Sequence, residues 1–325
     1  MSEPDAATLL NIYRTATTIR QCDERFLGML TAGEIAITYY SPRGQEVISA
    51  AVSSHLRTED YVITTYRGLH DHIAKGVPLD LLWAEFLGRA TGTCKGKGGP
   101  MHITHPASGL MVTTGLVGAG LPIANGFALS SLMKGDGRVT VCNFGDGATN
   151  IGAFHEALNL ATLWNLPIVF VCQNNLYGEK TPYANHTKAE SIQVRGTSYS
   201  MASLQVDGND AEAIWRASGE AIDRARSGGG PTLIEAMTFR FRGHNFGDDN
   251  FYISDEQMQW AHERDSVPRL RARLLDLGHA TEDELSTLEK EVGEQIEAAV
   301  SFALDSPYPE LDEIKRDVYS EEVAV

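Results

Sequence analysis

The chain has 325 residues, and its 27 lysines and arginines against 43 aspartates and glutamates give a formal net charge of −16 at pH 7. A chain this acidic is not expected to bind nucleic acid or an anionic membrane, because both favour basic surfaces. It has no apolar run of membrane-spanning length, and its N-terminus lacks the pattern of a signal peptide. We therefore expect a cytoplasmic protein that has neither a nucleic acid nor a membrane as its partner.

Segments of strand length and composition alternate with helical segments along the chain. A helical segment over residues 1–57 is expected to come first. The strands that we expect are Asp60–Thr65, Arg138–Phe144, Pro167–Gln173, Leu204–Asp207 and Pro231–Phe239. Several of these runs are apolar throughout, which is typical of parallel strands that are covered on both faces. This order predicts an α/β fold in which a doubly wound, mostly parallel sheet is flanked by helices, as a single domain over residues 1–325.

Three helices follow from apolar periodicity and capping signals. Asn150–Trp164 lies between two of the expected strands and completes a βαβ unit, and Ala211–Arg226 precedes the last expected strand. A helical C-terminal extension is expected from about residue 255 to residue 325. Within it, Thr281 and Glu284 form a capping-box pattern at the start of a helix. The packing face expected for that helix consists of Leu285, Leu288, Val292, Ile296 and Val300.

Cysteine and glycine usage add two expectations. The four cysteines are far apart and form no CxxC pair, so we expect reduced thiols rather than disulfides or a zinc site; they are Cys22, Cys94, Cys142 and Cys172. Nine of the 31 glycines fall between Gly92 and Gly126. We interpret this cluster as backbone shaped for close approach to a ligand and to a neighbouring subunit.

Polar residues follow two neighbouring apolar strands at the point where each strand ends. Gly145-Asp146-Gly147-Ala148 comes after one strand, and Asn174-Asn175-Leu176-Tyr177 comes after the next. In a parallel pair both segments lie at the carboxyl edge of the sheet, where open α/β folds bind ligands. Because a carboxylate and an amide oxygen suit Mg²⁺, and the start of the Asn150 helix suits phosphate, the pair predicts a magnesium-phosphate site.

At this point the sequence resembles the alpha subunit of the thiamine-diphosphate-dependent decarboxylase component of 2-oxo acid dehydrogenase complexes, in the pyruvate and acetoin branches. The motifs that carry the resemblance span nearly the whole chain in family order. They are Thr65-Tyr66-Arg67-Gly68, Lys95-Gly-Lys-Gly-Gly-Pro-Met-His102, Gly115-Leu-Val-Gly-Ala119, Gly145-Asp-Gly-Ala148, Asn174-Asn175-Leu-Tyr177-Gly178 and Arg242-Gly-His-Asn245.

The resemblance implies a cofactor, a metal and the residues that hold them. Mg²⁺ would bind the side chains of Asp146 and Asn175 and the backbone carbonyl of Tyr177. Gly147 and Ala148 would lie along the diphosphate of thiamine diphosphate. The remaining implied cofactor contacts are Tyr66 and Arg67 at the terminal phosphate, Gly115 and Val117 at the aminopyrimidine, and His244, also the implied catalytic residue, on a loop over Arg240–Ile253.

The resemblance also implies partners. In this family a beta subunit supplies the glutamate that activates the cofactor, so this chain alone should be inactive. The expected assembly is an α₂β₂ heterotetramer that passes the acyl unit from a 2-oxo acid or acetoin to a lipoyl-bearing acyltransferase.

Two positions depart from the family pattern. Tyr40 stands where many relatives have a histidine, and a phenol does not titrate near neutral pH. This leaves the substrate open. Asn245 follows the loop histidine where mitochondrial relatives have a phosphorylatable serine, which excludes that form of control here.

Several alternatives remain open at the level of sequence. Lys95 and Lys97 fit loop residues better than phosphate ligands, and His102 and His105 are structural candidates that could also face a substrate channel. The enzyme could instead be a thiamine-dependent transferase that moves a two-carbon unit to a carrier protein. A non-catalytic cofactor-binding subunit is a further possibility. A dinucleotide-dependent dehydrogenase is disfavoured because Gly118-Ala-Gly120 does not continue into the dinucleotide-binding fingerprint.

Overall fold

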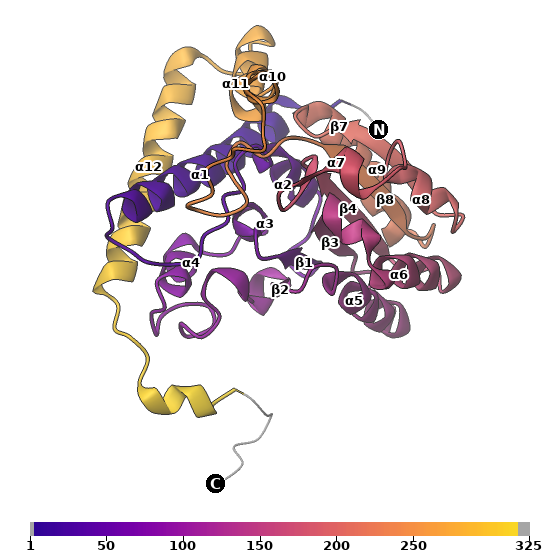
Figure 1. The fold of residues 1–325 in the computed structure, drawn as a ribbon, viewed down its shortest axis with the longest axis horizontal. Coiled ribbons are helices and arrows are strands. Elements are labelled where there is room, and N and C mark those ends of the chain that lie inside the picture. The colour runs from indigo at the N-terminus through magenta and orange to yellow at the C-terminus, as the bar shows by residue number, and fades with distance from the viewer. Residues whose placement is uncertain (1–2, 318–325) are drawn as a thin grey trace.

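The centre of the molecule is a six-stranded sheet in which every neighbouring pair of strands is parallel. A computed structural model describes residues 3–317. The strand order is β2-β1-β3-β4-β8-β7 (Figure 1). The strands are β1 (Tyr61–Thr65), β2 (Leu110–Thr114), β3 (Thr140–Gly145), β4 (Ile168–Asn174), β7 (Ala202–Asp207) and β8 (Thr232–Met237). A separate two-stranded hairpin, β5 (Tyr177–Gly178) with β6 (Thr181–Pro182), follows β4.

Alternate side chains of the central strands enter two separate hydrophobic cores. On β4, Val169 and Val171 belong to one core, whereas Ile168, Phe170 and Cys172 belong to the other. All five are fully buried. This two-sided burial is why the strand has no polar alternation in the sequence, and it confirms the parallel, covered sheet that the apolar runs predicted.

Helices cover both faces of the sheet. The first core is closed by α1 (Ala6–Thr31), α2 (Glu46–Ser53) and α9 (Ala211–Arg226), with α12 (Glu282–Asp305) packed on α1. The second is closed by α5 (Gly120–Lys134) and α6 (Gly152–Leu163), which lie together on the opposite face (Figure 1). The remaining helices are α3 (Leu69–Ala74), α4 (Leu79–Phe86), α7 (Tyr183–His186), α8 (Gln193–Thr197), α10 (Asp255–Glu263) and α11 (Ser266–Asp276). In residues 3–317, no helix has both the length and the apolar character needed to cross a membrane.

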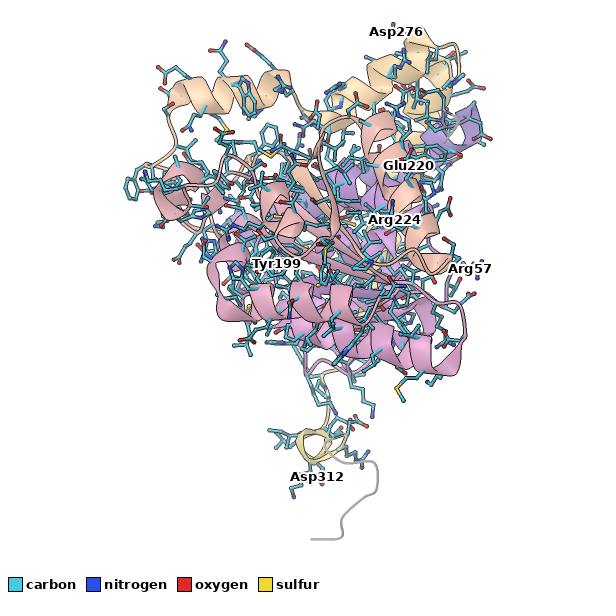
Figure 2. All side chains as sticks on the ribbon, turned by 90° about the vertical axis from the view of Figure 1, so that its right-hand side faces the viewer. Arg57, Tyr199, Glu220, Arg224, Asp276 and Asp312 are labelled. Carbon is cyan, nitrogen blue, oxygen red and sulfur yellow. The ribbon has the colours of Figure 1, made fainter. Side chains whose placement is uncertain are left out.

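Four short 3-10 helices complete the secondary structure of the described chain. They are η1 (Gly99–Met101), η2 (Pro106–Ser108), η3 (Asp146–Asn150) and η4 (Leu311–Lys315). The last of these carries Asp312 and extends away from the body of the molecule (Figure 2). Two lysines of the glycine-rich loop, Lys95 and Lys97, form ion pairs with Glu313 and Asp317 of this C-terminal segment. The lysines are therefore exposed loop residues, as predicted, and their ion pairs connect the loop to the C-terminal segment.

The five expected strands are confirmed to within two residues at every end, and the helix Ala211–Arg226 is confirmed at both ends. The capping box is present, with Thr281 and Glu284 exchanging both hydrogen bonds, and the predicted packing face of α12 is buried. The helix expected over Asn150–Trp164 is confirmed, although it begins two residues later than expected. Asp146–Asn150 forms η3, Ile151 is extended, and α6 begins at Gly152. Strand β2 was not predicted; only two of its five residues are buried, whereas every residue of β4 is buried.

Candidate functional site

A cavity of about 480 Å³ lies at the carboxyl edge of the sheet. Segments that follow five strands line it, namely those after β1, β2, β3, β4 and β8. The strand order reverses between β1 and β3, so the cavity lies at the switch point where open α/β sheets bind ligands. The structure brings all ten residues of the predicted site to this one cavity: Tyr66, Arg67, Gly115, Val117, Asp146, Gly147, Ala148, Asn175, Tyr177 and His244.

Asp146 has one carboxylate oxygen paired and one oxygen without a partner. Its side chain is buried, and Oδ2 lies 2.9 Å from Nε2 of His186. Oδ1 is also buried, but no hydrogen-bond partner for it exists among the described residues. Because a buried unpaired carboxylate oxygen is costly, this atom fits a ligand to a bound cation. Nowhere in residues 3–317 do three or more His, Cys, Asp or Glu side chains form a metal-binding group, so this carboxylate would act with neutral oxygen ligands.

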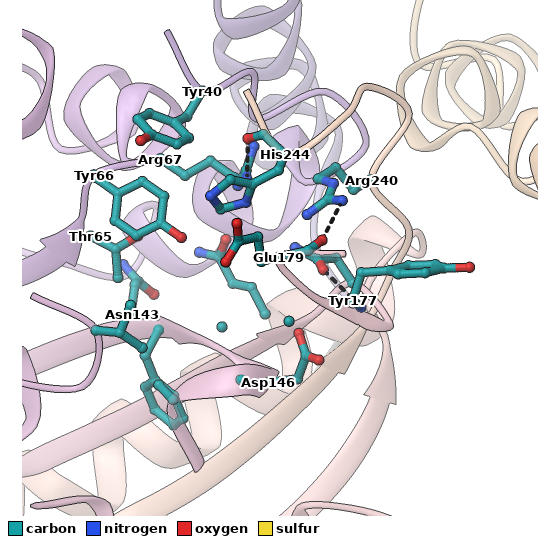
Figure 3. Close-up of a pocket in the computed structure, with 18 of the residues that line it drawn as sticks. Tyr40, Thr65, Tyr66, Arg67, Asn143, Asp146, Tyr177, Glu179, Arg240 and His244 are labelled. Atoms are coloured by element: carbon teal, nitrogen blue, oxygen red, sulfur yellow. Dashed lines mark hydrogen bonds between the residues drawn. The ribbon is translucent and has the colours of Figure 1, made fainter. Parts of the chain in front are cut away.

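Asn175 is held so that its side-chain oxygen could bind the same cation as Asp146. Its amide nitrogen donates to Oε1 of Gln45 at 3.0 Å, which fixes the orientation of the amide. Among the described residues, the amide oxygen accepts a single hydrogen bond, of 3.3 Å, from the backbone N–H of Tyr177. Tyr177 turns its ring away from the cavity, where it packs against Phe239 and Tyr252 (Figure 3). Its backbone is therefore the part that can contact a ligand.

The turn that carries these residues contains strained backbone. Leu176 has a φ of 69°, in the left-handed region that a branched side chain rarely adopts. Asn174 stabilises the turn by accepting a hydrogen bond from the N–H of Leu176 at 3.1 Å. The second asparagine of the motif is thus free to face the cavity while the first holds the turn. Strain of this kind is typical of ligand-binding loops.

Two buried arginines, Arg67 and Arg240, face the cavity, which Glu179 also lines. Within the described chain neither forms an ion pair, and their hydrogen bonds go to neutral oxygens. Burial, together with the charge of Arg240, lowers the pKa of Arg67 to about 10. Two desolvated positive charges at one cavity strongly favour an anionic ligand, and a planar guanidinium can bind two phosphate oxygens at once.

His244 lies on a loop that is anchored at several points. Its carbonyl accepts from Arg67 at 2.9 Å, and its N–H donates to Asp248 at 2.7 Å. Tyr252 also donates to Asp248 at 2.7 Å and accepts from Arg240 at the same distance. Against the effect of burial, these hydrogen bonds lower the pKa of Asp248 to about 2. The loop over residues 240–253 is therefore fixed to the cavity wall, although it contains no helix or strand.

The imidazole of His244 faces the arginines and two aromatic rings (Figure 3). Burial and the charges of Arg67 and Arg240 lower its pKa to about 4, so it is neutral at pH 7. Tyr40 contacts both His244 and Tyr66 edge-to-face, with ring centroids 5.3 Å and 4.5 Å away. Tyr40 therefore lines the cavity at the position where the sequence departs from the family pattern.

The floor of the cavity is a chain of buried amides. Gln45 donates to Gln173 at 2.5 Å, and Gln173 donates to Asp71 at 3.3 Å. His70 lies 2.6 Å from the same oxygen of Gln173, and its Nδ1 is buried without a partner in the described residues. This series of hydrogen bonds reaches Asn175 through Gln45 and fixes its side chain. His102 and His105 do not line the cavity.

The glycine-rich cluster is only partly explained by the cavity. Gly115 and Gly118 line it, but the first part of the cluster surrounds the buried carboxylate of Glu85. Glu85 accepts four backbone hydrogen bonds of 2.7–3.0 Å, from the N–H groups of residues 94, 96, 98 and 99. A Cβ on Gly92 would come within 2.7 Å of Glu85. Within this chain, the close neighbour of this part of the cluster is therefore an internal side chain, Glu85.

Sequence reasoning missed several residues that line the cavity. Arg240, Gln45, Gln173, His70 and His186 were given no role. Gln173 could have been found as the polar end of an otherwise apolar strand, and Arg240 as a charge directly after the last strand. His186 had no local signal, since it reaches Asp146 across 40 residues of chain.

Comparison with known proteins gives a consistent result. Residues 13–312 match the sequence model of the dehydrogenase E1 component family. The chain is 44% identical over 310 residues to the alpha subunit of acetoin:2,6-dichlorophenolindophenol oxidoreductase from Bacillus subtilis, covering 95% of this chain and 92% of the relative. The subunit of the same name from Cupriavidus necator is 38% identical, with 97% and 95% covered. The alpha subunit of the pyruvate dehydrogenase E1 component from Porphyra purpurea is 35% identical, with 96% and 93% covered.

Proposed function

Because this chain belongs to the dehydrogenase E1 component family, we propose that it is the alpha subunit of a thiamine-diphosphate-dependent pyruvate or acetoin dehydrogenase. One observation carries the proposal at the level of the site. A single cavity joins a buried carboxylate oxygen to two buried guanidinium groups; within residues 3–317 the oxygen has no hydrogen-bond partner and the guanidinium groups form no ion pair. A magnesium diphosphate supplies the cation for the first and the anion for the second.

The assignment of residues to this ligand follows the cavity wall. Asp146 and Asn175 would bind Mg²⁺ through side-chain oxygens, and Tyr177 would bind it through its backbone carbonyl. Gly147 and Ala148 would lie along the diphosphate, where a Cβ on Gly147 would come within 3.3 Å of Gly178. The terminal phosphate would contact Tyr66, Arg67 and, as an addition from the structure, Arg240.

Bound thiamine diphosphate supplies the electron sink for decarboxylation or carbon–carbon cleavage next to a carbonyl group. The chain's own contribution is binding, orientation and charge. Gly115 and Val117 form the wall assigned to the aminopyrimidine. His244, the proposed catalytic residue, is neutral at pH 7, so one ring nitrogen can accept a proton or a hydrogen bond while the other donates.

A beta subunit is the proposed partner, in an α₂β₂ assembly that delivers its product to a lipoyl-bearing acyltransferase. The relatives' names as alpha subunits support a partner chain. At the rim of the cavity, the side chains of Leu116 and Val117 are 73% and 51% exposed, as expected for apolar groups that another chain covers. The four free cysteines, three of them buried, support a reducing cytoplasm.

Reconstitution of the two chains tests this function. The co-purified alpha–beta complex should bind thiamine diphosphate in a Mg²⁺-dependent manner by calorimetry, and it should acylate a lipoyl domain from pyruvate or acetoin. The higher identity to the acetoin subunits makes acetoin the first substrate to assay. Alpha alone should be inactive. Sustained turnover by alpha alone, or transfer of a two-carbon unit to another carrier without lipoyl acylation, would contradict the proposal.

A further inference from the structure

We propose that His186 is a positioning residue that directs the unpaired oxygen of Asp146 toward the cation, through a hydrogen-bonded chain that begins at Arg195. This inference rests on the proposed magnesium-diphosphate site and deepens it. None of the three residues Arg195, Asn150 and His186 belongs to the motifs that carry the family resemblance. His186 contacts one of those motifs through Asp146.

The orientation of the Asn150 amide is set by Arg195. The guanidinium group of Arg195 has only donors, and its Nη2 donates to Oδ1 of Asn150 at 3.1 Å. The same guanidinium donates to the carbonyl of Thr149 and to the hydroxyl of Thr187, which fixes its position. The amide oxygen of Asn150 must therefore face Arg195, and its amide nitrogen must face the other way.

This orientation determines which nitrogen of His186 carries the proton. The amide nitrogen of Asn150 lies 2.9 Å from Nδ1 of His186 and donates to it, so Nδ1 acts as an acceptor. The neutral ring then carries its hydrogen on Nε2, which lies 2.9 Å from Oδ2 of Asp146. His186 therefore donates a hydrogen bond to the carboxylate. Because Nε2 carries this hydrogen, it cannot bind a metal ion.

The consequence for Asp146 is a carboxylate with two unequal oxygens. Oδ2 is occupied by His186, and Oδ1 is buried and has no partner among the described residues. A carboxylate that is held through one oxygen presents the other in a single orientation, which favours monodentate binding of Mg²⁺. Partners that orient a ligand in this manner commonly change metal affinity 10- to 100-fold when they are removed.

Glutamine can replace the function of the ring but leucine and alanine cannot. In His186→Gln the side-chain oxygen can accept from Asn150 while the nitrogen donates to Asp146. His186→Leu keeps apolar volume without a donor, and His186→Ala is a second, smaller variant on the same four-residue helix α7. His155→Leu is the matched control, since His155 is exposed, bonds Tyr199 at 2.8 Å and does not line the cavity.

The test uses the co-purified alpha–beta complex and measures thiamine diphosphate binding by calorimetry at a series of Mg²⁺ concentrations. We expect His186→Leu and His186→Ala to raise the half-saturating Mg²⁺ concentration about 10- to 100-fold. His186→Gln should stay within about threefold of the unsubstituted complex, and His155→Leu should match it. Equal Mg²⁺ requirements for all four variants, or a glutamine variant as weak as the leucine variant, would overturn the positioning role alone. Absence of Mg²⁺-dependent binding in the unsubstituted complex would overturn the proposed function as well.

Discussion

At the scale of single residues, Asp146 is the one carboxylate among the protein groups assigned to the proposed cation site. The other assigned ligands are an amide oxygen and a backbone carbonyl, so no second carboxylate can compensate for its loss. We therefore expect Asp146→Ala to abolish Mg²⁺-dependent binding of thiamine diphosphate by the alpha–beta complex in calorimetry. Asp276→Ala is the control, because Asp276 is an acidic residue at the end of α11 (Figure 2) and does not line the cavity. Unchanged affinity in Asp146→Ala would refute the metal assignment.

A second prediction for a single residue concerns Arg240, whose charge lowers the pKa of the neighbouring His244. Burial, and then the charges of Arg67 and Arg240, hold the pKa of His244 at about 4. Arg240→Gln removes one of the two charges, so the pKa of His244 should rise, and titration of its ring by NMR would show this.

The same variant should weaken thiamine diphosphate binding about 10- to 100-fold, since a charged hydrogen bond typically contributes about 1.5–3 kcal/mol. Lys180→Gln is a suitable control, as Lys180 is half-exposed and contacts the outer side of the loop. If the pKa of His244 and the affinity both stay unchanged in Arg240→Gln, the assignment of Arg240 to the diphosphate is wrong.

At the scale of elements, Glu85 organises the loop that leads from α4 to β2. Its carboxylate accepts from four backbone N–H groups, and a glutamine side chain offers only one acceptor oxygen. We expect Glu85→Gln to lower the free energy of unfolding by more than about 2 kcal/mol, because buried N–H groups lose their acceptors.

Urea unfolding followed by circular dichroism measures this difference. Lys97→Ala serves as the comparison, because its ion pairs with Glu313 and Asp317 lie at the surface, where solvent screens the charges and makes such pairs weak. A loss in Glu85→Gln no larger than that in Lys97→Ala would show that the four hydrogen bonds do not hold the loop.

The helices and strands also show which parts of the fold and of the site can be predicted from the sequence. Strands β3 and β4 were predicted because two-sided burial makes an unbroken apolar run, and α12 because its capping box and apolar stripe are local signals. Asp146 and Asn175 were predicted because strand ends in a parallel sheet meet at one edge. Contacts made by long-range packing left no such pattern, which is why the partners His186 and Glu85 were not found.

At the scale of the whole molecule, buried histidines make stability depend on pH. His72 is fully buried, and burial, followed by the charge of His70, lowers its pKa to about 3 from an ordinary value of 6.5. Between these values the unfolded chain binds a proton that the folded chain excludes. The stabilisation is thus complete above about pH 6.5 and is lost as the pH falls, at up to about 1.4 kcal/mol per pH unit.

His72→Gln should remove this contribution while retaining a partner for the hydroxyl of Thr113, which lies 2.9 Å from Nε2 of His72. Urea unfolding at pH 7 and pH 5 measures the outcome. Between pH 7 and pH 5, we expect the free energy of unfolding to fall by about 2 kcal/mol less in the variant than in the natural chain. His155→Gln, which replaces an exposed histidine, should not alter the pH dependence. An identical pH dependence for His72→Gln and the natural chain would contradict the prediction.

The arrangement of the loop around Glu85 has a consequence for how the loop can evolve. Its shape is specified by one carboxylate and by main-chain N–H groups, so the identity of most loop side chains carries no information about that shape. Saturation mutagenesis across residues 92–99 should yield an alternating tolerance profile. Gly92, Gly96 and Gly98, where a Cβ would meet Glu85, Gly88 or His102 at 2.7 Å or less, should accept almost no replacement, whereas Lys97 between them should accept most residues.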